Sequence, residues 1–180
     1  AEVNLEAGRS YPLRFEYYEN ISAATARLGW REKAGDRVPE AVAAAARSDV
    51  ALVFAGLSDY YESETFDRAT MALPEGQDAL IRAVAEANSR TVVVINSGSP
   101  VLMSGWIGKV PAVVMNWYPG QEHGHAIAAV LAGDEDPGGR LPLTLPRSWE
   151  DCAAFGRYPG RGGSVSYEEG LFVGYRHFDR

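Results

Sequence analysis

The sequence contains a single cysteine, Cys152, so its 180 residues cannot form an internal disulfide. No cysteine and histidine residues recur at the spacing of a zinc site, and the longest apolar run is far too short to cross a bilayer. Positive charge is scarce as well, because 17 Lys and Arg stand against 24 Asp and Glu, which gives a net charge of −7. Since non-specific nucleic-acid binding needs a basic surface that displaces counterions, we expect no nucleic acid, no membrane and no metal among its partners.

Several nucleotide-binding and catalytic motifs are also missing. No glycine-rich phosphate loop follows any apolar run, which disfavours a nucleotide-binding α/β domain and leaves no cofactor to expect. Residues 96–100 follow an apolar run but lack the Gly-x-Ser-x-Gly elbow of serine hydrolases. Residues 134–138 resemble the opening of a calcium loop, but Gly138 stands where the third ligand belongs, so we interpret them as a turn.

The overall composition is typical of a soluble globular protein, with 46% hydrophobic and 23% charged residues. The length suits one domain or slightly more, which is enough to bury a core. No signal peptide opens the sequence. We therefore expect a soluble protein, while its compartment stays unknown.

Three regions differ in their patterning. Residues 1–31 show the period-2 alternation of half-buried strands, with Tyr11, Leu13, Phe15 and Tyr17 on one face and a second alternating run from 24 to 30. We expect an N-terminal β-hairpin that belongs to a β-sandwich and does not join the α/β layer, because a lone hairpin is marginal in water. Residues 147–180 are rich in glycine and aromatics, and we expect an irregular C-terminal extension there.

Residues 38–146 alternate between helical patterns and continuous apolar runs. Apolar runs without alternation are typical of parallel strands that are covered by helices on both faces. The sequence therefore predicts an α/β fold, a three-layer sandwich with a mainly parallel sheet. We expect helices over 39–47, 75–88 and 121–132, strands over 50–55, 91–95 and 112–115, and a short edge strand over 141–145.

The most polar and aromatic loop, residues 56–68, follows the first apolar run. It holds four carboxylates, one guanidinium and three aromatic rings. Open α/β sheets place their binding crevices at the carboxyl ends of parallel strands, so this loop is the candidate site. Carboxylates suit acid/base chemistry and aromatic rings can stack on sugar faces. A solvated acidic loop with an Asp67–Arg68 bridge is the alternative explanation, and the pattern alone favours it slightly.

An ordered series of motifs extends beyond this loop. The motifs are Glu62 to Arg68, Leu73-Pro74 with Gln77, 92–98 with Pro100, Trp117 to Glu122, Leu131 with Gly133, Pro137 with 139–142, Thr144 with Pro146, and Tyr167 with Glu169-Gly170 and 173–176. Taken together, the series resembles the C-terminal half of a glycoside hydrolase family 3 enzyme of the β-glucosidase type.

The resemblance carries further implications about architecture. It implies that residues 1–31 are the terminal strands of an inserted protective-antigen-type module and that residues 38–146 form most of an α/β sandwich domain. Residues 147–180 then lead into a fibronectin-III-like domain. In this family an (α/β)₈ barrel, for which these 180 residues hold no counterpart, supplies an aspartate nucleophile, so the chain alone is expected to be catalytically incomplete.

The resemblance also assigns a mechanism and roles. It maps the general acid/base of a retaining β-glycosidase onto Glu64, with Glu62 as the alternative, and Thr65 stands where the family usually has Gly. Tyr60, Tyr61, Asp67 and Arg68 are expected to bind substrate or support the loop. The implied partners are a β-linked glucoside or related oligosaccharide and the barrel domain of the same enzyme. A non-catalytic carbohydrate-binding or interaction fragment remains the alternative.

Overall fold

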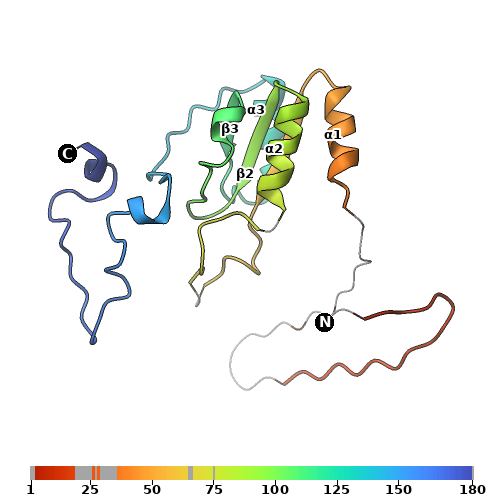
Figure 1. Ribbon diagram of the computed structural model, residues 1–180, viewed down its shortest axis with the longest axis horizontal. Coiled ribbons are helices and arrows are strands. Elements are labelled where there is room, and N and C mark those ends of the chain that lie inside the picture. Colours follow the sequence, from red (N-terminus) through yellow and green to blue (C-terminus); the bar gives the residue numbers. More distant parts are fainter. Residues whose placement is uncertain are drawn as a thin grey trace. The chain divides into compact units, whose positions relative to one another are not determined.

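Figure 1 shows the chain as a computed structural model. The structure describes residues 3–18, 26, 28, 36–64, 67–74 and 76–179. The chain divides into two compact units, Ala1–Gly35 and Asp36–Arg180, and each is described by itself.

The larger unit contains a three-stranded parallel sheet in the order β1-β2-β3, which confirms the expected α/β class. In register, Ala51 lies opposite Thr91 and Val92 lies opposite Ala112. Figure 1 shows α2 on the near side of the sheet and α3 behind it. The elements are α1 (Val38–Ala46), β1 (Ala51–Gly56), α2 (Gln77–Ala87), β2 (Thr91–Asn96), η1 (Ile107–Lys109), β3 (Ala112–Met115), α3 (His123–Ala132), η2 (Trp149–Asp151) and η3 (Gly174–Asp179).

Local sequence explains where these helices begin and end. Helix α1 has a proline in its first turn, where the missing N–H leaves no intrahelical bond unmade. Helices α2 and α3 start two residues later than the sequence pattern predicts. Gly76, inside the predicted range and directly before α2, has a left-handed backbone that a right-handed helix cannot include. Residues 121 and 122 form a turn, and Glu122 is the N-cap of α3. Gly133 ends α3 as a left-handed C-cap.

The main hydrophobic cluster lies on one face of the sheet, while Val94 of β2, on the opposite face, is also fully buried. Val93 and Ile95 of β2 pack with Ile81 of α2 and with Trp106, and all four are fully buried or nearly so. The indole N–H of Trp106 donates to Asp78 Oδ1 at 2.8 Å, which satisfies the one polar group of that buried ring. The core thus holds α2 and the segment before η1 firmly against the sheet.

Two expectations within this unit were wrong. Residues 141–145 form no strand in the part of the chain described, and Pro142 has no N–H to offer a ladder. The expectation that helices cover both faces of β1 was also wrong. One face carries Leu52 and Phe54, which are about half exposed, at 48% and 51%. The reason is that α1 packs on α2, and α2 packs on β1 from the side of Val53, so the opposite face of this strand carries no helix among the described residues.

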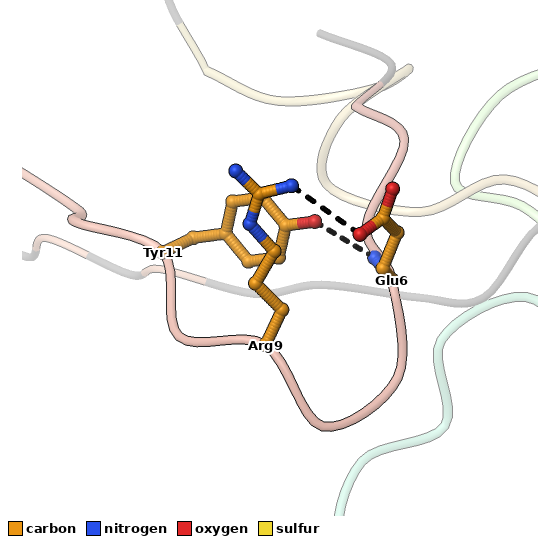
Figure 2. A network of polar contacts seen from close by, with 3 residues as sticks. All are labelled: Glu6, Arg9 and Tyr11. Carbon is orange, nitrogen blue, oxygen red and sulfur yellow. Dashed lines mark hydrogen bonds and ion pairs between the residues drawn. The ribbon is translucent and has the colours of Figure 1, made fainter.

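The N-terminal unit has no strand within residues 3–18, so the first half of the expected hairpin is not formed. Alternation of side chains sets which face is apolar, but a strand also requires a ladder partner. The second half of the hairpin lies outside the described residues, apart from Ala26 and Leu28. Figure 2 shows what orders this segment locally.

Three side chains build that local network. The Glu6 backbone N–H donates to the Tyr11 hydroxyl at 2.9 Å, and Arg9 Nη1 donates to Glu6 Oε2 at 3.3 Å. The Arg9 guanidinium also lies 5.3 Å from the centre of the Tyr11 ring. All three are solvent-exposed, so these contacts contribute little to stability.

The C-terminal stretch from 147 onward is irregular, as expected, with the two short helices η2 and η3. An ion pair between Arg157 and Glu168, 3.2 Å apart, joins two segments of this stretch that are 11 residues apart in the sequence. None of the helices in the described part of the chain has the length and apolar character that crossing a membrane requires.

Candidate functional site

Three loops meet at the carboxyl edge of the sheet, one after each strand. Because β1, β2 and β3 are parallel, their carboxyl ends lie at the same edge, where crevices form in open α/β sheets. The loop after β1 carries the candidate carboxylates, the loop after β2 begins with the buried Ser97, and the loop after β3 contains Trp117 and Tyr118. Hydrogen bonds between side chains and backbone join the three loops.

Glu62 is the point where all three loops are joined. Its Oε2 accepts a hydrogen bond from the Gly98 backbone N–H at 3.1 Å and another from the Tyr118 hydroxyl at 3.1 Å. The Tyr118 hydroxyl also lies 3.3 Å from the carbonyl oxygen of Leu57. Partial burial raises the pKa of the Tyr118 phenol, and the adjacent Glu62 carboxylate raises it further, because both disfavour a phenolate.

Arg68 anchors the loop that follows β1 on the C-terminal side of Glu64. Its Nη1 donates to Ser99 Oγ at 2.8 Å and to the Pro100 carbonyl oxygen at 3.0 Å, and its Nη2 donates to the Ala72 carbonyl oxygen at 3.4 Å. Burial lowers the pKa of this guanidinium, and the Glu62 carboxylate opposes that effect. The expected ion pair with Asp67 is not present among the described residues, because the guanidinium donors face these other oxygens.

Gln77 closes the base of the same loop. Its Oε1 accepts from the Gly56 N–H at 2.7 Å, and its Nε2 donates to the Gly56 carbonyl oxygen at 2.9 Å. Gly56 is the last residue of β1, with φ of +154°, and a Cβ there would lie 2.0 Å from the Asn96 carbonyl oxygen. Only glycine fits this close approach of two strand ends.

The loop after β3 is fixed by a second set of amides. Asn116 Nδ2 donates to Asn96 Oδ1 at 2.8 Å and lies 2.6 Å from His123 Nε2, which must accept because an amide nitrogen only donates. The next residue, Trp117, has φ of +52°, a left-handed conformation that bulky side chains rarely adopt. This strained backbone connects the amide network to Tyr118.

The other residues expected at the site lie on its open side. Glu64 is exposed, and no hydrogen bond or ion pair reaches its carboxylate from the described residues. Tyr60 is 80% exposed and Tyr61 43%, with their rings 5.1 Å apart in an edge-to-face pair. Asp67 is exposed as well. The loop therefore presents the carboxylates of Asp59, Glu64 and Asp67 and the rings of Tyr60 and Tyr61 to solvent, while hydrogen bonds fix Glu62 and Arg68 to the neighbouring loops.

Sequence reasoning assigned no role to Gln77, Gly98 or Tyr118, although all three lie in the motifs quoted above. The available signal was their position, because Gly98 and Tyr118 each follow a predicted parallel strand by three residues. Their partners are 36 and 56 residues away in the chain, at Glu62, so local pattern could not identify the contacts. Within the described residues, no group of three or more His, Cys, Asp or Glu side chains could hold a metal ion.

The fold and the site together define an α/β domain whose polar loops are collected at the carboxyl edge of a parallel sheet. The sequence of residues 2–175 matches the protein-family model of the glycosyl hydrolase family 3 C-terminal domain. The chain belongs to glycosyl hydrolase family 3.

Curated relatives agree with this assignment. The chain is 44% identical over an alignment of 188 positions to a β-glucosidase from Rhizobium radiobacter, covering 98% of this chain and 23% of that protein. It is 50% identical over 142 positions to the thermostable β-glucosidase B of Acetivibrio thermocellus, covering 79% of this chain and 19% of that protein. The chain therefore spans about a fifth of the length of these relatives.

Solved structures give the same result for the fold. A β-glucosidase from Kluyveromyces marxianus in complex with glucose superposes with a TM-score of 0.77 at 41% identity, over 82% of this chain and 18% of that one. A β-glucosidase from Streptomyces venezuelae in complex with D-glucose superposes with a TM-score of 0.72 at 44% identity, over 79% of this chain and 18% of that one.

Proposed function

We propose that this chain is the segment of a retaining β-glucosidase that supplies the general acid/base, and that Glu64 performs this role. The observation that carries the proposal is the contrast between two carboxylates in one loop. Glu64 is exposed and unengaged among the described residues, whereas the Glu62 carboxylate already accepts two hydrogen bonds from the protein. A group that exchanges protons with substrate and water needs the free position.

The mechanism follows the two-step course of retaining glycosidases. A carboxylate nucleophile attacks the anomeric carbon while Glu64 protonates the leaving oxygen, and a covalent glycosyl-enzyme forms. Glu64 then removes a proton from the incoming water, whose oxygen displaces the nucleophile from the anomeric carbon. We assign the nucleophile to an aspartate on a barrel domain outside these 180 residues, so both domains would line the active site.

The proposed substrate is a β-linked glucoside or a related oligosaccharide. Two of the superposing structures are glucose complexes of β-glucosidases, which supports the sugar class. The exposed rings of Tyr60 and Tyr61 supply apolar faces of the kind on which sugars stack. We extend the proposal to the flanking regions, with residues 1–31 ending an inserted β-sandwich module and residues 147–180 leading into a fibronectin-III-like domain.

The test uses the full-length enzyme with Glu64→Ala. We expect hydrolysis of a disaccharide, which has a poor leaving group, to fall by about 10²–10⁴-fold. An activated aryl β-glucoside should still glycosylate the enzyme, and azide should restore its turnover, because azide needs no general base. The matched control is Asp59→Ala, which removes an exposed carboxylate from the same loop. Normal disaccharide hydrolysis by Glu64→Ala would contradict the assignment.

A second candidate is a carbohydrate-binding segment that performs no chemistry, which the exposed Tyr60–Tyr61 pair also suits. In that case Glu64→Ala would leave every rate unchanged. Replacing both tyrosines by alanine would still weaken sugar binding. Titration of glucose into each variant, followed by calorimetry, separates the two candidates.

A further inference from the structure

We propose that Glu62 is a positioning residue, which acts by holding Gly98 and Tyr118 on one of its oxygen atoms and so fixes the loop segment that carries Glu64. This inference rests on the proposed function, because it takes Glu64 as the acid/base. It assigns Glu62 no proton transfer of its own. The role depends on the carboxylate as an acceptor of hydrogen bonds, not on its charge.

The geometry of the acceptor is the first support. Both hydrogen bonds, each 3.1 Å long, end on the same oxygen, Oε2. One donor is the backbone of the loop after β2 and the other is a side chain of the loop after β3. Glu62 therefore attaches the loop after β1 to both neighbouring loops through a single atom.

The two donors are themselves rigidly placed. A Cβ on Gly98 would lie 3.0 Å from both Glu62 Oε1 and Tyr118 Cε2, so the three groups are packed closely together. Tyr118 follows the left-handed Trp117, and the Asn116 amide fixes the residue before that. Strain of this kind persists only where the surrounding structure over-determines the backbone. The site to which Glu62 binds is thus a preformed one.

The loop is also held beyond Glu64. Arg68 donates to Ser99 Oγ and to the carbonyl oxygen of Pro100, both in the loop after β2. Glu64 lies two residues after Glu62 and four before Arg68, which limits its Cα to about 7 Å from one anchor and about 14 Å from the other. Releasing the nearer anchor gives the acid/base much more freedom than releasing the farther one. A misplacement of about 1 Å can cost about 10²-fold in rate.

The decisive experiment compares Glu62→Ala with Glu62→Gln in the full-length enzyme. A glutamine can place its carbonyl oxygen where Oε2 lies and accept both hydrogen bonds, so it preserves the proposed function of the side chain and removes its charge. We expect Glu62→Ala to lower kcat on a disaccharide by about 10²-fold with KM nearly unchanged and with no rescue by azide. Glu62→Gln should keep most of the wild-type kcat, and Asp59→Ala should match the wild type.

Tyr118→Phe supplies the second arm and guards against a variant that merely unfolds. It removes one of the two donors and leaves the ring in place, so kcat should fall less than in Glu62→Ala. Because the two side chains form one contact, the double variant Glu62→Ala/Tyr118→Phe should be no slower than Glu62→Ala alone.

Each other outcome overturns a particular statement. Equal activity of Glu62→Ala and the wild type would remove the positioning role and leave Glu64 as the acid/base. Equal loss in Glu62→Ala and Glu62→Gln with full rescue by azide would make Glu62 the acid/base, which is a failure of the proposed function itself. Equal loss without rescue would show that the charge of Glu62 is needed, and that would overturn the acceptor mechanism.

Discussion

The side-chain amide of Gln77 binds both backbone polar groups of Gly56, 21 residues away, at 2.7 and 2.9 Å. The amide therefore pairs with the backbone of Gly56, at the end of β1, by one accepted and one donated hydrogen bond, as the backbone of an adjacent strand would. It joins the first residue of α2 to the last residue of β1, and the entire candidate loop lies between them.

Gln77→Leu should destabilise the protein by about 2 kcal/mol, because the partly buried N–H and carbonyl oxygen of Gly56 lose their partners. The midpoint of a urea titration measures this. Gln77→Glu tests the geometry, since it keeps the acceptor for the N–H but places a carboxylate oxygen against the carbonyl. It should not restore stability, and a Glu variant as stable as the wild type would contradict the two-bond arrangement.

Gly56→Ala should cost about 3 kcal/mol or more, since the added Cβ would meet the Asn96 carbonyl oxygen at 2.0 Å and force two strand ends apart. The matched control is Gly124→Ala, in α3, where a Cβ meets nothing within 4 Å. Alanine there should stabilise the protein by about 0.5–1 kcal/mol through the unfolded chain. Thermal denaturation of the two variants should therefore shift in opposite directions.

Asp78→Ala should destabilise the protein by about 1–3 kcal/mol, because it leaves the buried Trp106 indole N–H without an acceptor. Asp78→Asn keeps an oxygen at that position and should recover most of the loss. Urea unfolding followed by tryptophan fluorescence reports both variants. If the Asn variant is as unstable as the Ala variant, the charge near the start of α2 matters more than this hydrogen bond.

Cys152 should alkylate slowly at neutral pH. Burial raises the pKa of its thiol, and the neighbouring Asp151 and Glu150 carboxylates raise it further. Because the thiolate is the nucleophile, the rate of reaction with iodoacetamide should rise with pH through a midpoint above the ordinary thiol value of about 8.5. Mass spectrometry of the Cys152 peptide measures the rate. Glu150→Gln should lower the midpoint, whereas the remote Glu135→Gln should not.

The α/β alternation was predictable because each buried strand is an unbroken apolar run, and residues 91–95 match β2 to within one residue. The expected hairpin was wrong over Tyr11–Tyr17 because alternation identifies a face but supplies no ladder partner. The expected second covered face of β1 was wrong for a related reason, since the apolar character of Leu52 and Phe54 does not say what packs on them.

The candidate loop was predictable from its position after the first strand, but its internal division of roles was not. Glu62 and Glu64 are both carboxylates in one acidic segment, and residues two apart in an extended chain point the same way. The structure separates them through Gly98 and Tyr118, which lie in the loops that follow β2 and β3. Only the tertiary arrangement brings those donors within reach.

The left-handed backbone of Trp117 has a consequence for how this domain responds to selection. A bulky residue in that conformation costs about 1–3 kcal/mol, which glycine or asparagine would largely recover. A library screened for heat resistance alone should therefore accumulate those residues at position 117. The orientation of the Tyr118 side chain toward Glu62 would then be less well defined. The same library screened for turnover should reject them, because at this position higher stability comes with lower activity.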